Sequence, residues 1–219
     1  MYGPTITAIF DQGKGDGPVE LELGPIKNEK EAAKLFTGWI NDNRVRIFLA
    51  HPNPCTVSAE EEWIEKKNTE PDSMNWAIYA KGILVGNIEL MDIDRSQRRA
   101  ELGIVIGEKL WWRRGIATVA ETLVFEYAFN NIVAGGMNKI TARAVLDNSG
   151  GLKVLKRVGF REVGILRQDD WAQGRWHDLW LGELLSEDWS GIREETLNAA
   201  GITTYELYPG SEDLGSDID

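Results

Sequence analysis

Residues 101–120 contain the side chains best suited to binding an anion. The stretch reads as a short apolar strand, a polar turn and a helix that opens on Arg113, Arg114 and Gly115. Free backbone N–H groups at the positive end of a helix dipole suit a phosphate, and a glycine lets the backbone approach it closely. An ordinary strand–turn–helix with two solvated arginines fits these residues equally well, so the rest of the sequence has to decide.

The composition indicates one soluble globular domain. The chain has 219 residues, 42% hydrophobic and 27% charged, with no apolar run near the roughly 20 residues of a membrane helix. The N-terminus lacks the basic start and apolar core of a signal peptide. With Cys55 as the single cysteine no internal disulfide forms, so we expect a reducing cytoplasm. That cysteine and two histidines, His51 and His177, argue against a metal site.

The negative charge is concentrated near the C-terminus. The net charge is −11, and residues 187–219 contribute −8 of it, from nine acidic residues against Arg193. No basic stripe remains in residues 1–186 that would favour nucleic-acid binding. We therefore expect one domain over 1–186 and an acidic, partly disordered extension over 187–219. On this prediction, removal of residues 196–219 leaves folding and turnover nearly intact.

The order of predicted elements indicates an α+β domain around one sheet. Residues 1–17 end in a glycine-rich stretch that looks flexible. Strands are expected at about 18–23, 75–81, 83–94, 101–106, 139–146, 160–167 and 176–185. Helices are expected at about 28–42, from Ser58 to Lys67, from Ile116 to Ala128, and after Asn148 up to Gly159.

Four segments together carry a family resemblance. They are SAEEEWIEK (58–66), WRRGIAT (112–118), DNSGGLKVLKRVGFREVG (147–164) and GRWHDLWLGELL (174–185). In this order and spacing they resemble the RimJ/RimL-like branch of the GNAT superfamily, the acetyl-CoA-dependent N-acetyltransferases. The resemblance covers about residues 18–186.

The resemblance implies a mixed, mostly antiparallel sheet with a V-shaped splay between the parallel strands at 101–107 and 139–146, in which acetyl-CoA lies. Its pantetheine would pair with the first strand, its pyrophosphate would rest on the helix N-terminus, and Asn148 would lie near its other side. An extended amide chain satisfies its polar groups only against a strand edge without a partner. The implied acetyl-CoA-binding residues are Ile104, Val105, Ile106, Trp112, Arg113, Arg114, Gly115, Ile116, Ala117, Thr118 and Asn148.

The sequence departs from the family pattern at several positions. Trp112 stands where the superfamily often has glutamine or arginine, a substitution common in this branch. Arg113 replaces a frequent glycine, at little cost unless the position needs φ > 0. Where some relatives place a serine or a tyrosine as the acid that protonates the leaving thiolate, this chain has Gly151 and Leu155. Ser149 is nearby but out of register, so no general acid is assigned.

Acetyl transfer requires a neutral amine, a base and an oxyanion donor. An amine with a pKa around 10 is only about one part in a thousand free base at pH 7. In this family a backbone N–H of the splayed strand, here around Val105, would bind the oxyanion. The candidate bases are Glu89 and Glu101, with Asp92 and Asp94 nearer the turn. Glu89 lies within an apolar run and is narrowly favoured, although a solvent-facing or salt-bridged glutamate explains either residue equally well.

Three other polar residues are weaker candidates. His177 on the terminal hairpin is more often packed or exposed than catalytic. Cys55 has no adjacent base that would activate it. Asp178 is expected to anchor the hairpin, and the tryptophans at 171, 176 and 180 to serve packing, although a rim tryptophan could face an amine.

The resemblance leaves two functions open. The first is direct acetyl transfer from acetyl-CoA to a primary amine, either a protein N-terminal amine or a polyamine or aminoglycoside. The second is a non-catalytic sensor that binds acetyl-CoA. The expected partners are acetyl-CoA and an amine, without nucleic acid, membrane or metal, and a homodimer stays open. The carboxylates available for a cationic acceptor are Glu60, Glu61, Glu62, Asp169 and Asp170.

Overall fold

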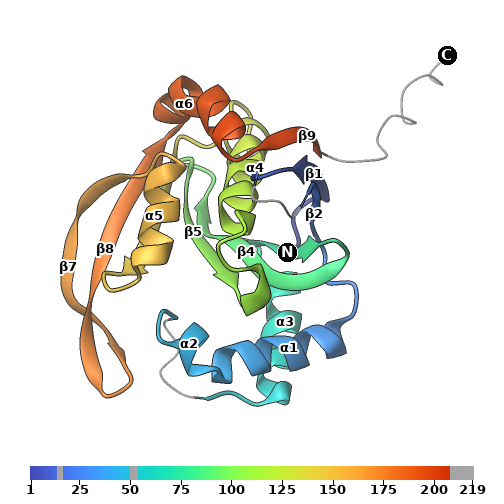
Figure 1. The fold of residues 1–219 in the computed structure, drawn as a ribbon. Helices are drawn as coiled ribbons and strands as arrows, with labels where there is room; N and C mark the ends of the chain where they lie inside the picture. Colours follow the sequence, from blue (N-terminus) through green and yellow to red (C-terminus); the bar gives the residue numbers. More distant parts are fainter. Residues whose placement is uncertain (14–16, 50–53, 208–219) are drawn as a thin grey trace.

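A computed structural model describes residues 1–13, 17–49 and 54–207. Within them a nine-stranded sheet runs in the order β7-β8-β6-β5-β4-β3-β2-β1-β9 (Figure 1). The strands are β1 (Ile6–Phe10), β2 (Val19–Gly24), β3 (Met74–Ala80), β4 (Ile83–Asp94), β5 (Arg99–Ile106), β6 (Lys139–Val145), β7 (Arg161–Ala172), β8 (Arg175–Leu185) and β9 (Ile202–Leu207). The helices are α1 (Glu29–Asn41), α2 (Asn43–Arg46), α3 (Val57–Thr69), α4 (Ile116–Asn131), α5 (Ser149–Arg157) and α6 (Ser186–Ala199), with a 3-10 turn at Lys109–Trp111.

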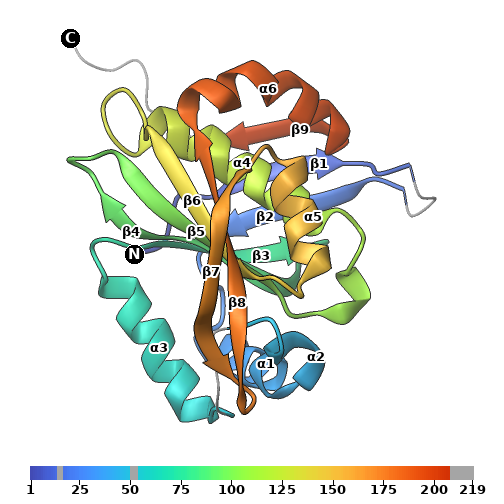
Figure 2. The ribbon, with the colours of Figure 1, turned by 90° about the vertical axis from the view of Figure 1, so that its left-hand side faces the viewer.

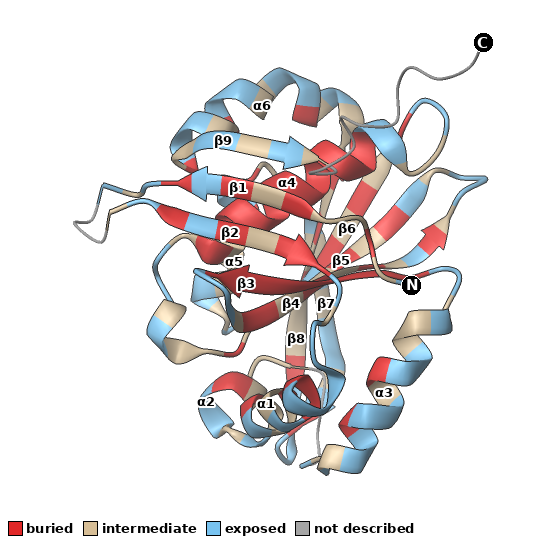
Figure 3. Cartoon of the chain, turned by 90° about the vertical axis from the view of Figure 1, so that its right-hand side faces the viewer, coloured by how far each residue is buried: buried red, intermediate tan, exposed pale blue. Residues whose placement is uncertain are grey.

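Helices cover the two faces of the sheet unequally. α4, α5 and α6 pack on one face, where they form the larger apolar core with the strands. α1, α2 and α3 form a smaller core against the other face (Figures 1 and 2). α4 is buried on nearly every side, including its polar residues Thr118, Glu121, Thr122 and Glu126 (Figure 3). β3 is buried along its whole length at the centre of the sheet.

Local capping explains where the helices near the site begin. The Thr56 hydroxyl accepts the Ala59 N–H at 3.2 Å. Thr56 is therefore the N-cap of α3, two residues before the predicted cap Ser58. The Asn148 side chain caps α5 by accepting the Gly151 N–H at 2.9 Å, as the asparagine-initiated pattern indicated.

The predicted V-shaped splay is present. All strand pairs in the sheet are antiparallel except β5 and β6. Those two pair in parallel only from Arg99↔Lys139 to Leu102↔Ala142. Beyond that point β6 stays paired with β8 as far as Val145, and β5 with β4 as far as Ile106. The two strands therefore diverge, and the fold is the mixed α+β sheet that the resemblance implies.

Both ends of the described chain differ from the sequence-based expectation. Residues 6–10, where no strand was predicted, form β1, and residues 202–207 form β9, which pairs with β1. α6 packs onto the core through Trp189, which is 2% exposed. The sheet thus continues to Leu207 rather than ending at 186, and the segment from 196 is part of the fold. The rest of the predicted extension, 208–219, lies outside the described residues, as does His51.

No helix among the described residues is long and apolar enough to cross a bilayer.

Candidate acetyl-CoA and amine site

β5 presents an open edge where it leaves β6. From Gly103 to Ile106 it has no strand partner on that side among the described residues. The Gly107 N–H donates to Val85 O at 3.0 Å, and backbone groups alternate in direction along an antiparallel pair. The Val105 N–H and C=O therefore face β4, while those of Ile104 and Ile106 face the opening. The Val105 N–H, predicted as the oxyanion donor, therefore does not face the opening, because the strand register decides which amide faces the gap.

The Trp112 indole lies at the end of this edge. Its Nε1–H donates to Ile106 O at 2.6 Å. This bond occupies one of the carbonyls to which a pantetheine amide would donate. Trp112 thereby holds the end of β5 against the turn that leads into α4.

The turn before α4 has the shape that a phosphate loop requires. Gly115 is the N-cap of α4 with φ 83, and no side chain caps the helix. The first N–H groups of α4 are therefore available to an anion. Arg113 has φ 62, so this position does adopt the left-handed conformation in which many relatives place glycine. The Gln12 amide lies against Gly115, where a Cβ would come within 2.6 Å of Gln12 Cδ.

Asn148 follows β6, on the other arm of the V. Its side chain is used to cap α5, and its backbone N–H donates to Val145 O at 2.8 Å. Leu155, the position at which some relatives carry a tyrosine, is buried in the core. Positions 151 and 155, where some relatives carry the acid, therefore supply no proton donor to the opening.

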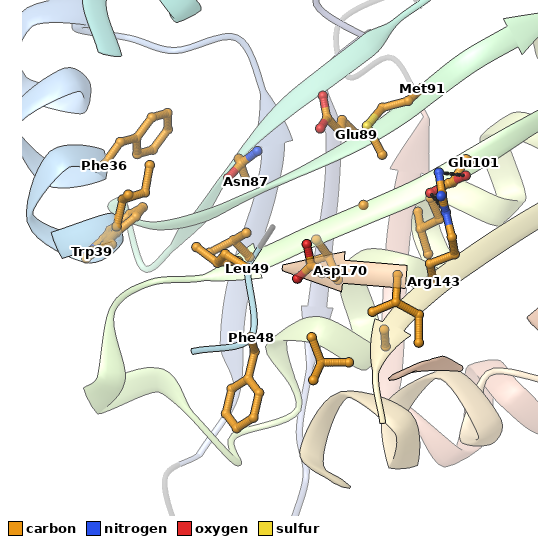
Figure 4. Close-up of a pocket in the computed structure, with 18 of the residues that line it drawn as sticks. Phe36, Trp39, Phe48, Leu49, Asn87, Glu89, Met91, Glu101, Arg143 and Asp170 are labelled. Atoms are coloured by element: carbon orange, nitrogen blue, oxygen red, sulfur yellow. Dashed lines mark hydrogen bonds and ion pairs between the residues drawn. The ribbon is translucent and has the colours of Figure 1, made fainter. Parts of the chain in front are cut away.

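A cavity of about 510 Å³ lies on the face of the sheet that α4, α5 and α6 do not cover, between α1, α3 and the β7–β8 hairpin. It reaches the open edge of β5 through Gly103, Ile104 and Val105. Figure 4 shows aromatic side chains on one side of it and carboxylates on the other. The aromatic and aliphatic wall consists of Phe36, Trp39, Ile40, Phe48, Leu49 and Trp63. The charged residues lining it are Glu60, Glu89, Glu101, Arg143, Asp169 and Asp170.

Glu89 projects into this cavity from β4. Its carboxylate forms an ion pair of 3.0 Å with Lys67 of α3, and both side chains are largely buried. Burial tends to lower the pKa of Lys67, but the Glu70 and Glu89 carboxylates outweigh it, so the pKa is raised and the ammonium persists. Gly103 on β5 leaves room for Glu89, whose Oε1 lies 3.6 Å from the point that a Cβ would occupy. Glu89 thus lies over the first residue of the open edge.

Glu101 projects from β5 on the same face and is bound by arginine. Its two oxygens accept hydrogen bonds of 3.0 Å from Nε and a terminal amino group of Arg143 on β6. This pair raises the pKa of Arg143. It also bridges the two strands just below the point where they diverge.

Three other residues considered from the sequence, Asp94, His177 and Cys55, do not line the cavity. The Asp94 carboxylate accepts the N–H groups of Ser96 and Gln97 and so shapes the β4–β5 turn. His177 is buried with Nε2 3.2 Å from Ala172 O. Burial and the nearby Glu60 carboxylate raise the pKa of the Cys55 thiol, which opposes a nucleophilic role.

The tryptophans of the hairpin divide into two groups. Trp180 is buried and donates to Glu162 at 2.7 Å. Trp171 and Trp176 are about half exposed and contact each other edge to face, with ring centroids 5.1 Å apart.

Several residues of the site were not identified from the sequence. Lys67 and Arg143 neutralise the two candidate bases, and Trp39 and Trp63 form the apolar wall of the cavity. The sequence predicted a helix at about 28–42, but not the face of the sheet that this helix covers. Among the described residues, no group of three or more histidine, cysteine, aspartate or glutamate side chains could hold a metal ion.

Comparison with known proteins agrees with this geometry. The family model of the acetyltransferase (GNAT) domain matches residues 20–161. The chain belongs to the GNAT acetyltransferase family. The putative ribosomal N-acetyltransferase YdaF of Bacillus subtilis is 33% identical over 171 residues, covering 74% of this chain and 91% of that protein. The family transfers acetyl groups to amines, and the N-acetyltransferase activity predicted from the sequence is confirmed at this level.

Two solved GNAT structures show the same fold. Mycobacterium smegmatis RimJ in complex with CoA-disulfide aligns with a TM-score of 0.74 at 21% identity, covering 92% of this chain and 98% of that one. Spermidine N-acetyltransferase from Vibrio cholerae, in complex with CoA and spermine, aligns with a TM-score of 0.69 at 20% identity, covering 78% and 98%. Because the chain belongs to the GNAT acetyltransferase family, acetyl-CoA is its cosubstrate.

Proposed function

We propose that this GNAT protein transfers the acetyl group of acetyl-CoA directly to a primary amine bound in the 510 Å³ cavity. The observation that carries the proposal is the open edge of β5. That edge lies between the uncapped N-terminus of α4 and a cavity lined by Glu89 and Glu101. A single opening thus joins a place for the phosphates, a place for an extended amide chain and a place for an amine.

The described residues fit acetyl-CoA on physical grounds. Backbone groups of Ile104 on the open edge need partners, which the amides of pantetheine supply. The N–H groups from Ile116 to Thr118 and the cations of Arg113 and Arg114 suit the pyrophosphate. Acetyl-CoA brings the activated thioester, and the residues of this chain bind and orient it.

The amine enters as an ammonium ion and must lose a proton before it reacts. Glu89 is the proposed acceptor of that proton, because it lies over Gly103 beside the open edge. The free amine then attacks the thioester carbonyl carbon, the carbon–sulfur bond breaks, and the thiolate takes up a proton. A backbone N–H facing the opening, that of Ile104 or Ile106, is the proposed donor to the oxyanion. Water is the proton source for the thiolate in this scheme, since positions 151 and 155 carry no acidic group.

Two relatives bear on the acceptor. One is named for ribosomal acetylation and another for spermidine. Both acceptors are cationic amines, and the cavity of this chain combines carboxylates with an aromatic wall. We therefore propose a positively charged primary amine as the acceptor class.

The test is release of free thiol from acetyl-CoA in the presence of an amine panel. The panel contains n-butylamine, spermidine, an aminoglycoside and a tripeptide with a free N-terminus. Release above the amine-free background with at least one amine is the expected result. Binding of acetyl-CoA without release for any amine would favour the alternative of a sensor, which the missing serine and tyrosine support. Failure to bind acetyl-CoA would overturn both functions.

Assembly and location rest on the sequence alone. The homodimer and the cytoplasmic location stay predictions, and sedimentation velocity would test the first.

A further inference from the structure

The β7–β8 hairpin is irregular where it borders the cavity. Leu166 pairs with Leu179, and the next pair is Asp170 with His177. Residues 167–169 of β7 therefore lie opposite a single residue of β8, Asp178. Such a bulge bends its strand and redirects side chains.

Asp178 holds this bulge in place. Gln168 at its centre has φ 51, an uncommon conformation for a residue other than glycine. Its N–H donates to Asp178 Oδ1 at 2.8 Å, which satisfies a backbone donor that the strand ladder has lost. The carbonyl of Asp178 accepts the Leu146 N–H at 2.9 Å, so the bulge is tied to the end of β6.

The bulge brings two consecutive carboxylates to the cavity. In a regular strand neighbouring side chains point to opposite faces. Here Asp169 and Asp170 both line the cavity. Figure 4 shows the Asp170 carboxylate between Leu49 and Arg143, directed into the open space.

Asp170 differs from Glu89 and Glu101 in its partners. Its Oδ2 is shielded from solvent and makes no hydrogen bond within the described part of the chain. Glu89 and Glu101, by contrast, are ion-paired with Lys67 and Arg143. His177, which pairs with Asp170 across the hairpin, has its Nε2 directed at Ala172 O instead.

A buried carboxylate oxygen without a donor costs roughly 1–3 kcal/mol, which a bound cation with N–H donors would recover. We propose that Asp170 binds the amino group of the acceptor and that Asp178 is its positioning residue. This inference rests on the proposed acetyl transfer and names the residue that selects a cationic amine.

The first test observes Asp170 directly. The protein is saturated with CoA, and its aspartate ¹³Cγ resonances are followed by NMR during titration with n-butylammonium chloride. The Asp170 resonance is assigned by its absence in Asp170→Asn. We expect it to shift with n-butylammonium and not with n-butanol or sodium chloride. An unmoved resonance, in a protein that acetylates n-butylamine, would overturn the inference.

The second test is kinetic and uses the amine on which the wild type is most active. Asp170→Asn should lower kcat/KM by roughly 10- to 100-fold, mainly through KM for the amine, with unchanged affinity for acetyl-CoA. Asp72→Asn, an exposed aspartate on the α3–β3 turn, is the matched control and should stay at wild-type activity. An equal loss in Asp169→Asn would show that charge in general, rather than Asp170, binds the amine.

Variants of Asp178 test whether this residue positions Asp170 or only supports the fold of the hairpin. Asp178→Ala removes the acceptor of the Gln168 N–H and should raise KM for the amine. Asp178→Asn keeps an oxygen that accepts this N–H and should restore KM to near the wild-type value. Equal KM for both variants would remove Asp178 from the proposal. A shift of the Asp170 resonance without thiol release from any amine would leave amine binding intact and overturn the acetyl transfer instead.

Discussion

The Arg193 guanidinium of α6 donates hydrogen bonds of 2.7 Å to both carboxylate oxygens of Glu126 in α4. The same carboxylate accepts the Tyr205 hydroxyl of β9 at 2.7 Å and the Trp189 indole at 3.2 Å. The Glu126 side chain is only 3% exposed. This one carboxylate therefore joins α6 and β9 to α4, the buried helix that begins after Gly115.

Arg193→Met should destabilise the protein by roughly 3 kcal/mol, because it leaves the Glu126 carboxylate buried without its cation. Urea unfolding measures the change. Arg161→Met is the matched control, since it breaks the Arg161–Asp188 pair between β7 and α6, in which Arg161 is mostly exposed. Its cost should be below about 1 kcal/mol. Equal costs for the two variants would contradict the role given to Glu126.

Deletion of residues 200–219 should abolish cooperative folding or soluble expression, contrary to what the sequence suggested. The deletion removes β9, uncovers the edge of β1 and takes away the Tyr205 hydroxyl. A chain that ends after Leu207 is the control, because it keeps β9 whole. Circular dichroism melting compares the two. A cooperative transition at the wild-type temperature in the shorter chain would contradict the structure.

Gly115→Ala should weaken binding of CoA by at least about tenfold, because a Cβ at φ 83 is strained and also displaces the Gln12 amide from the loop. Calorimetric titration with CoA measures the change. Gly82→Ala is the matched control, with φ 76 and open space around the added methyl group. It should lose about 1 kcal/mol of stability and keep its affinity for CoA. Unchanged affinity in Gly115→Ala would remove the loop from the site.

Glu89→Gln should lower kcat by roughly 100-fold while binding of acetyl-CoA persists, since the amide cannot accept the proton of the amine. Glu70→Gln controls for the ion pairing, because Glu70 also pairs with Lys67, at 2.9 Å, but does not line the cavity. Steady-state rates should fall only in the first variant. If Glu101→Gln alone lowers kcat, the base is Glu101.

Glu121→Gln should stabilise the protein more at pH 8 than at pH 5. Burial raises the pKa of Glu121 in the folded protein to about 8, from an ordinary value of 4.5. Between these values the folded state holds a proton that the unfolded state has released, so wild-type stability falls as the pH rises through this window. The gain at pH 8 should be on the order of 3 kcal/mol. The exposed Glu20→Gln should show no such difference, and a gain independent of pH would contradict the raised pKa.

The parts of the site that the sequence predicted are those encoded locally. The turn with Arg113 and Gly115, the Asn148 cap and the helix after each depend on residues within a few positions of one another. The parts that it did not predict depend on pairing across long stretches of chain. Arg143 reaches Glu101 only because β5 and β6 are adjacent and in parallel register.

Strand register also explains why the Val105 N–H faces β4 and not, as predicted, the opening. A one-residue difference decides whether an amide faces β4 or the open edge, and hydrophobic pattern does not fix it, because that pattern distinguishes only the two faces of the sheet. β1 and β9 escaped prediction for a related reason. Each is short; β1 pairs with β2 and β9, and β9 becomes a strand by pairing with β1, nearly 200 residues away in the sequence.

The contact between Gln12 and Gly115 links the phosphate loop to the order of protein synthesis. The Gln12 amide that lies on Gly115 donates at 2.7 Å to the carbonyl of Ala200, between α6 and β9. On the ribosome the loop and α4 are made long before that carbonyl exists. A nascent chain that stops short of residue 200 therefore has every residue of the turn before α4 but lacks the carbonyl that holds the Gln12 amide against Gly115.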